Sequence, residues 1–186
     1  MARNLGRVGR HIVLLRGINL GPNRRVAMPR LREVLEQAGF EDVRTYVQSG
    51  NIVLSSAKKP DKVAADCERV IAEEFGFDVP VVVRTRDELA AIVKRNPLGK
   101  VATEPKRYQV SFLDRKPDAR LVKELKSLAA DAEGFAASGR EFYAWHPEGV
   151  ARSKLWNKLA NKGLGVTATA RNWTTVTTLL EMADEQ

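Results

Sequence analysis

Cysteine and histidine, the side chains most often used for metal and redox chemistry, are scarce in this 186-residue chain, which has one cysteine and two histidines. Cys67 is alone and cannot form an internal disulfide, which agrees with a reducing compartment. His11 and His146 are far apart in the sequence, and no Cys-x-x-Cys or His-Glu-x-x-His motif occurs. Walker A and Gly-x-Gly-x-x-Gly motifs are absent too. The sequence therefore predicts no metal site and no cofactor.

Long apolar runs are also missing. The longest one near the start spans residues 12–15, which is too short for the core of a signal peptide or for a membrane span. We interpret this run as a buried strand. Because nothing in the sequence directs export, we expect a cytoplasmic protein that does not bind membranes.

Acidic residues are absent from the first 32 positions, which contain eight arginines, at 3, 7, 10, 16, 24, 25, 30 and 32. The net charge of the whole chain is +8, and the net charge of these 32 residues alone has the same value. A positive field of this kind attracts phosphates or nucleic acid. The alternative is a basic segment that only aids solubility.

One order of elements is predicted twice. Residues 12–95 and residues 107–183 each follow the order strand, helix, strand, tight turn, strand, helix, strand, helix. This order is typical of an α+β protein with two tandem ferredoxin-like (βαββαβ) subdomains, which have antiparallel sheets and are each followed by an extra helix.

The turns and helix starts support the repeat. We expect the two hairpins to turn on Ser49-Gly50 and Ser138-Gly139, so that Val47 faces Ile52 on the apolar side of the first sheet. Thr85 and Glu88 form a capping box, and Asn172 and Asp61 are expected to be N-caps of their own helices.

The predicted domain boundaries follow from this order. Residues 1–10 are expected to be a disordered basic tail, 11–96 the first subdomain, 97–106 a linker and 107–186 the second subdomain. Because residues 12–15 are apolar at consecutive positions, both faces of that strand need cover. We expect the other half, or a second chain, to supply it.

The first group of candidate binding residues lies in the first half. The long connection over 17–27 carries Arg24 and Arg25, and it is expected to fold its backbone around a phosphate. The alternative is a surface loop without a ligand. The candidate residues are Arg16, Gly17 and Asn19 in this region, together with Gln48, Ser49 and Asn51 in the first hairpin.

The second group lies at two helix starts in the second half, where free backbone N–H groups favour anions. These candidates are Arg152, Ser153, Lys154, Arg171, Asn172 and Trp173. The alternative is that the hydroxyl and the amide only cap their helices, while the tryptophan packs in the interior. Tyr143 and Trp145 share one face of a strand and are candidates for stacking on RNA bases, or else for filling an interface.

Several strings of the sequence resemble the bacterial domain-of-unknown-function family 1697. They are Leu14-Leu15-Arg16-Gly17-Ile18-Asn19, Tyr46-Val47-Gln48-Ser49-Gly50-Asn51, Phe75-Gly76-Phe77-Asp78-Val79-Pro80, Arg152-Ser153-Lys154-Leu155 and Thr169-Ala170-Arg171-Asn172-Trp173-Thr174-Thr175-Val176. The resemblance runs from about residue 11 to 183 and implies two ferredoxin-like subdomains in tandem. It implies no activity, cofactor or catalytic residue.

The function favoured by the sequence is binding of a phosphate-bearing ligand, either nucleotide-like or a nucleic acid, by basic and polar groups at turns and helix N-termini. One alternative is a small enzyme that acts on an anionic substrate, for which the sequence offers no catalytic residue. Another is an oligomeric structural protein with no ligand. The identity of the ligand and the oligomeric state stay open.

Overall fold

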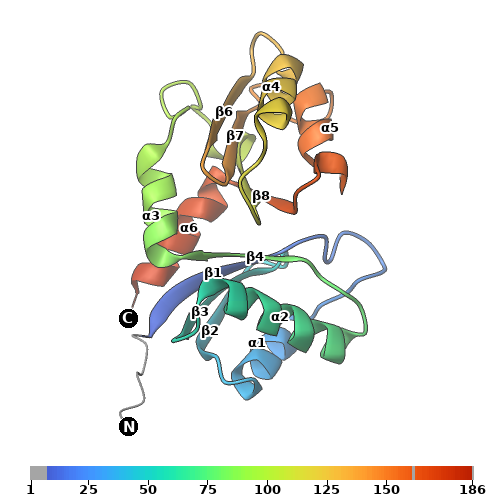
Figure 1. Ribbon diagram of the computed structural model, residues 1–186, viewed down its shortest axis with the longest axis vertical. Helices are drawn as coiled ribbons and strands as arrows, with labels where there is room; N and C mark the ends of the chain where they lie inside the picture. Colours follow the sequence, from blue (N-terminus) through green and yellow to red (C-terminus); the bar gives the residue numbers. More distant parts are fainter. Residues whose placement is uncertain (1–7, 161, 186) are drawn as a thin grey trace. The chain divides into compact units, whose positions relative to one another are not determined.

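The computed structural model describes residues 8–160 and 162–185, and these residues form two four-stranded antiparallel sheets (Figure 1). Two compact units are present, one made of Met1–Ala90 with Leu179–Gln186 and the other of Ala91–Thr178. The boundaries predicted at residues 96 and 107 stay predictions. Among the helices of the described residues, none combines the length and apolar character that a bilayer crossing needs.

The first unit has the predicted βαββαβ order. Its strands pair as β2-β3-β1-β4, all antiparallel. The elements are β1 (Gly9–Leu15), α1 (Met28–Gln37), β2 (Glu41–Tyr46), β3 (Asn51–Ser56), α2 (Pro60–Phe75) and β4 (Val81–Thr85), followed by α3 (Arg86–Arg95). Because β1 begins at Gly9, the expected disordered tail is wrong for Gly9 and Arg10, and its residues 1–7 lie outside the described residues.

The core of the first unit lies between its sheet and the two helices α1 and α2, which cover one face of the sheet (Figure 1). Alternation along β1 directs Val13 and Leu15 to this face, where they meet the apolar stripe of α1 that includes Leu31 and Leu35. Cys67 of α2 is fully buried in the same core as a free thiol. Burial of each such aliphatic side chain contributes about 1.5–3 kcal/mol.

The first hairpin differs from its prediction. Tyr46 pairs with Asn51, and the connecting turn has four residues, 47–50, in place of two. Val47 consequently lies in the turn with a φ of 50° and is 53% exposed, so its predicted place opposite Ile52 is wrong. The wider turn is stabilised because the Asn51 side chain donates a hydrogen bond to the Tyr46 carbonyl at 3.1 Å.

The second unit repeats the strand order of the first as β6-β7-β5-β8. Its elements are η1 (Pro105–Arg107), β5 (Tyr108–Leu113), α4 (Ala119–Leu128), β6 (Gly134–Ser138), β7 (Glu141–Trp145), α5 (Lys154–Ala160), η2 (Lys162–Leu164), β8 (Ala168–Asn172) and α6 (Trp173–Asp184). Ser138 pairs with Glu141, so the second hairpin turns on Gly139-Arg140, one residue later than predicted. The α+β class with two βαββαβ sheets is thus confirmed.

The predicted helix caps are correct at two of three positions. The Glu88 amide donates to Thr85 Oγ1 at 3.1 Å and the Thr85 amide to the Glu88 carboxylate at 2.8 Å, which is the capping box of α3. Asn172 Oδ1 accepts from the Thr175 amide at 2.9 Å and caps α6. Asp61 is not an N-cap: α2 begins at Pro60, whose fixed φ suits the first helical position, and Lys59 before it has no capping side chain.

Candidate functional site

Asn19 joins the β1–α1 connection to the turn of the first hairpin. Its Nδ2 donates to the carbonyl oxygens of Val26 (3.0 Å) and Gln48 (2.8 Å), and its Oδ1 accepts from the Val26 amide at 2.9 Å. The side chain amide is therefore occupied by the protein itself. Asn19, predicted to bind a ligand, holds together the two loops that carry other predicted residues.

Arg24 attaches a third segment to the same end of the first unit. Its guanidinium donates to the carbonyl oxygens of Gly17 (3.1 Å) and Asp78 (2.6 Å) and lies 4.9 Å from the centroid of the Phe77 ring. The Arg16 amide donates to the Pro80 carbonyl at 3.0 Å. Three strings that carried the family resemblance, over residues 14–19, 46–51 and 75–80, thus lie together. We name residues 16–26 the arginine loop.

The positive charge of the arginine loop has no counter-ion in the described part of the chain. Arg24 contacts carbonyl oxygens and a ring, all of them uncharged groups. Arg16 is half-buried and Arg25 is exposed, and neither side chain has an ion pair or a hydrogen bond to a described residue. An anion that reached these guanidinium groups would not have to displace a carboxylate of the protein.

Other arginines of the same basic stretch have structural partners. Arg10 pairs with Asp42, and Arg30 with Glu33 at 2.8 Å and Glu74 at 2.6 Å. Arg32 donates to the hydroxyl of Thr45 at 2.7 Å, while the arginines at 3 and 7 lie outside the described residues. The sequence run therefore separates into arginines that stabilise the unit and arginines that remain available.

The hairpin residues among the candidates also divide by role. Asn51 is fully buried and donates to Ser49 Oγ at 3.0 Å as well as to the Tyr46 carbonyl, so it and Ser49 shape the turn. Gln48 is exposed and supplies only its carbonyl to the fold among the contacts of described residues. Of these three, Gln48 is the side chain best placed to meet a ligand.

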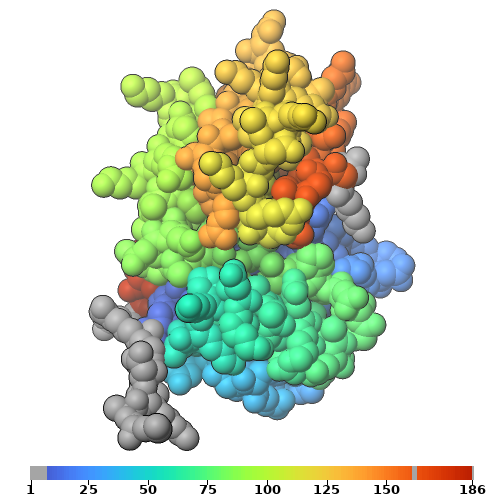
Figure 2. Space-filling model, in the orientation of Figure 1, coloured from blue at the N-terminus to red at the C-terminus, as the bar shows by residue number. Residues whose placement is uncertain are grey.

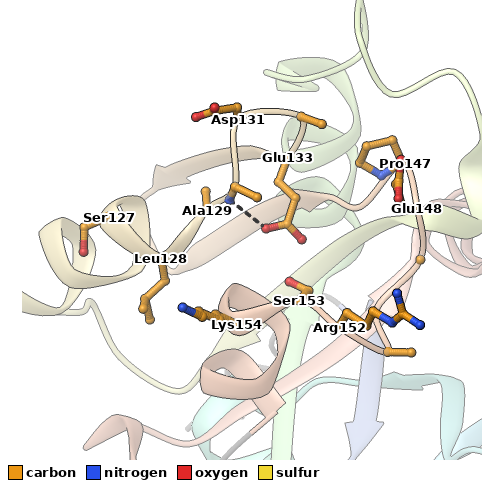
Figure 3. A pocket seen from close by; sticks show the side chains of 14 residues that line it. Ser127, Leu128, Ala129, Asp131, Glu133, Pro147, Glu148, Arg152, Ser153 and Lys154 are labelled. Atoms are coloured by element: carbon orange, nitrogen blue, oxygen red, sulfur yellow. Dashed lines mark hydrogen bonds between the residues drawn. The ribbon is translucent and has the colours of Figure 1, made fainter.

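Ser153 lines an open pocket of about 860 Å³ in the second unit, between the chain that follows α4 and the chain that precedes α5 (Figure 3). Its Oγ accepts from the Trp156 amide at 2.9 Å, so it caps α5. Arg152 and Lys154, the two exposed cations predicted beside it, line the same pocket.

Glu133 gives this pocket a negative floor that the sequence did not suggest. Its carboxylate accepts from His146 Nδ1 at 2.7 Å and from the Ala130 amide at 3.0 Å. Burial alone would raise the pKa of Glu133, but the nearby Ser153 hydroxyl, the Ala130 amide and His146 together outweigh burial and hold the pKa below its usual value. The carboxylate is consequently ionised at neutral pH.

An ionised carboxylate beside Ser153 disfavours the phosphate that was predicted there, since like charges at short range repel. The helix behind the site, α5, has only seven residues and offers a weak dipole. Nothing in the sequence pattern pointed to Glu133 or His146, because the contact between them depends on the pairing of β6 with β7.

The third predicted group is structural. Arg171 is buried and donates to Thr169 Oγ1 at 2.7 Å and to the Ala170 carbonyl at 2.8 Å, and burial lowers its pKa to about 10. The Trp173 ring stacks on Tyr108 with centroids 4.8 Å apart. With Asn172 as the cap of α6, these residues stabilise the second unit.

The same arrangement occurs in the first unit, where the buried Arg84 directly precedes the cap residue Thr85. Each unit thus repeats an arginine followed by an N-cap residue at the end of its fourth strand. In the sequence, the pairs Arg84-Thr85 and Arg171-Asn172 indicated this repeat. The predicted stacking role of Tyr143 and Trp145 is wrong, because both rings are buried.

Within residues 8–160 and 162–185, no three histidine, cysteine, aspartate or glutamate side chains lie in an arrangement that would hold a metal ion. Cys67 contributes to packing, and burial raises the pKa of its thiol to about 12, so it is a poor nucleophile.

A solved structure with a similar fold is that of the conserved bacterial protein SP0830 from Streptococcus pneumoniae. The two chains share 22% sequence identity with a TM-score of 0.78, over 95% of this chain and 99% of that chain. At this identity the likeness concerns the fold alone. No curated protein matches the sequence.

A sequence family described as a protein of unknown function, DUF1697, matches residues 8–143. This segment covers the arginine loop, the first hairpin and the 75–80 string, while the strings over 152–155 and 169–176 lie beyond it. Since the match extends over more than half of the sequence, the chain belongs to the DUF1697 family of proteins of unknown function.

Proposed function

We propose that this protein binds a phosphate-bearing ligand through the arginine loop of its first unit. The proposal rests on three guanidinium groups that have no carboxylate partner among the described residues. They belong to Arg16, Arg24 and Arg25. Guanidinium groups match the geometry of phosphate oxygens and stay charged at any physiological pH. Gln48 adds an exposed amide from the neighbouring turn.

The form of this surface favours an extended polyanion over a small enclosed ligand. The β1–α1 connection projects from the surface as the blue segment at the right of Figure 2. Leu20 and Val47, one from each loop that Asn19 joins, are 86% and 53% exposed. Small molecules are usually bound in concave sites, whereas a projecting basic surface suits a nucleic acid strand.

The competing interpretation is that the protein is an enzyme with its active site in the second unit. There His146 Nδ1 donates to the carboxylate of Glu133 at 2.7 Å, and Ser153 Oγ accepts from the Trp156 amide. A nucleophilic serine needs a base such as histidine on its own hydroxyl, with the carboxylate behind that base. The order of the three groups therefore supports a structural network more than a catalytic one.

The proposal is tested with a labelled single-stranded RNA of mixed sequence, whose binding to the full chain is followed by fluorescence anisotropy at several salt concentrations. Three phosphate contacts on a single strand predict a slope of about −2 for log K against log [salt]. For the Arg16→Ala, Arg25→Ala double variant, we expect a slope of about −0.7 and an affinity at least tenfold lower.

The matched control is a variant with the same change of charge in the other unit. Arg120 and Lys123 are exposed on α4 and have no hydrogen bond or ion pair to a described residue. The Arg120→Ala, Lys123→Ala double variant should therefore leave the slope unchanged. The proposal would be contradicted if RNA did not bind at low salt and nucleotides did not compete for the site. It would also be contradicted if the control lost as much RNA affinity as the Arg16→Ala, Arg25→Ala variant.

A further inference from the structure

We propose that the pocket in the second unit binds a free α-amino acid, with its ammonium group at Glu133 and its carboxylate between Arg152 and Lys154. This site is separate from the arginine loop and serves a ligand of another class. It is the pocket of about 860 Å³ that residues 127–133, 147–149 and 151–154 line (Figure 3).

The floor of the pocket is a buried carboxylate. The Glu133 side chain is 9% exposed, and it accepts hydrogen bonds from the Ala130 amide at 3.0 Å and from His146 Nδ1 at 2.7 Å. His146 Nε2 is buried without a hydrogen-bond partner among the described residues. An ammonium group from a ligand in the pocket would pair with the ionised Glu133 carboxylate.

Two cations lie beside this floor and face no carboxylate within ion-pair distance in the described chain. Lys154 and Arg152 flank Ser153, toward which the Glu133 carboxylate points (Figure 3). Both side chains are exposed and line the pocket. A ligand that carries only an ammonium group would be repelled by them, whereas one that also carries a carboxylate would pair with them.

A ligand that carries only a carboxylate is disfavoured in turn. Asp131 and Glu148 line the pocket together with Glu133, so three acidic groups face two basic ones. The remaining lining is largely apolar and includes Leu128, Ala129, Ala132 and Pro147. The combination of both charges with an apolar wall matches a zwitterion with an aliphatic side chain.

The test compares three molecules of one shape in two-dimensional ¹⁵N NMR titrations of the full chain: leucine, leucinamide, which lacks the carboxylate, and 4-methylpentanoate, which lacks the ammonium group. We expect leucine to shift the amides of residues 129–133 and 149–154 and to bind at least about tenfold more tightly than either analogue. Leucinamide binding as tightly as leucine would indicate a peptide N-terminus and overturn the proposal, as would equal binding of 4-methylpentanoate or no shift with leucine.

Variants assign the two ends of the ligand. Arg152→Ala with Lys154→Ala changes exposed groups only and should bring leucine to the affinity of leucinamide. Glu133→Gln should remove the binding of leucine and of leucinamide. If that variant fails to fold, the Arg152→Ala, Lys154→Ala variant still tests whether the pocket binds the amino acid. Lys126→Gln, an exposed cation on α4 outside the pocket, should change nothing. Unchanged leucine binding by the double variant would overturn the proposal, and RNA binding is measured alongside because it is independent of this site.

Discussion

Gly50 occupies a position in the first hairpin that no other residue can fill without strain. Its φ is +76°, and a Cβ at this site would lie 2.6 Å from Leu15 Cβ. Its carbonyl also accepts from the Leu15 amide at 2.8 Å. The turn that carries Gln48 is therefore held against the end of β1 by a close approach of two backbones, which places it beside the arginine loop.

Three glycine substitutions distinguish two losses of unfolding free energy, one from a side chain on a left-handed backbone and one from a clash of the added Cβ. Gly50→Ala combines a left-handed backbone with the clash, and we expect it to lower the free energy of unfolding by about 2–5 kcal/mol. Gly17→Ala has a φ of +68° with open space around its Cβ position, so about 1 kcal/mol is expected.

Gly21→Ala is the control, because its φ is not in the left-handed region and nothing lies within 4 Å of its Cβ position. It should change the free energy of unfolding by less than about 0.5 kcal/mol. Urea unfolding followed by circular dichroism measures all three variants. If Gly50→Ala were as mild as Gly17→Ala, the close approach to Leu15 would be unimportant.

At the scale of elements, the helix starts differ in how well they are capped. The box at Thr85 and Glu88 satisfies free amides of α3, and Asn172 does so for α6. In contrast, α2 begins after Lys59, which offers no capping side chain and places a positive charge at the positive end of the helix dipole. The longest helix of the described chain thus has an imperfect start.

A better cap should stabilise the first unit. Lys59 has an extended backbone, with φ −66° and ψ 152°, which is the conformation of an N-cap residue. We expect Lys59→Asp to raise the free energy of unfolding by about 0.5–1.5 kcal/mol, because the carboxylate would accept from a free amide and favour the dipole. Thr85→Ala should lower it by about 1 kcal/mol.

The Lys59→Asp variant is compared with Lys59→Ala in urea denaturation at low and at high salt. The alanine variant removes the charge without adding a cap, so it should recover only the smaller, salt-dependent share of the gain. No difference between the two variants would contradict capping as the cause.

At the scale of the whole molecule, buried titratable groups determine how stability varies with pH. Burial raises the pKa of the Cys67 thiol from 9.0 to about 12. Burial lowers the pKa of His11 below 6.5, and hydrogen bonds from Lys58 and Lys62 lower the pKa of Asp66. The contribution of Cys67 to the free energy of unfolding is lost as pH rises above 9.0, the pKa of the thiol in the unfolded chain. The contributions of His11 and Asp66 are lost as pH falls below the pKa that each group has in the unfolded chain.

The alkaline side gives a specific prediction. At pH 10.5 the thiol is ionised in the unfolded chain and neutral in the folded one, so the native protein should lose about 2 kcal/mol of unfolding free energy relative to pH 8 through this group. Cys67→Ala loses about 1 kcal/mol of packing at both values of pH. Because it lacks the ionisable thiol, the variant should be about 1 kcal/mol less stable than the native protein at pH 8 and about 1 kcal/mol more stable at pH 10.5.

The difference between pH 8 and pH 10.5 should therefore be smaller in Cys67→Ala by about 2 kcal/mol. Urea unfolding at the two pH values, in native protein and variant, measures this quantity. Equal pH dependence in the two proteins would mean that the thiol is accessible to solvent or ionises in the folded state.

The predicted site residues show where inference from a sequence ends. Asn19, Asn51 and Arg171 have the residue types of ligand-binding groups, yet each is occupied by hydrogen bonds to the protein. Glu133 lacked any signal but forms the floor of a pocket. A residue type and its place in a loop indicate that a contact is possible, and only the folded chain shows which partner makes it.

The sequence by itself determined the repeated order of strands and helices, the caps at Thr85 and Asn172, and the basic character of the first third, because these properties depend on residues that are close in the chain. The tertiary structure decided the four-residue turn at 47–50, the division of the arginines into paired and available ones, and the charge around Ser153. These depend on contacts between segments far apart in the sequence, and neither periodicity nor local propensity contains that information.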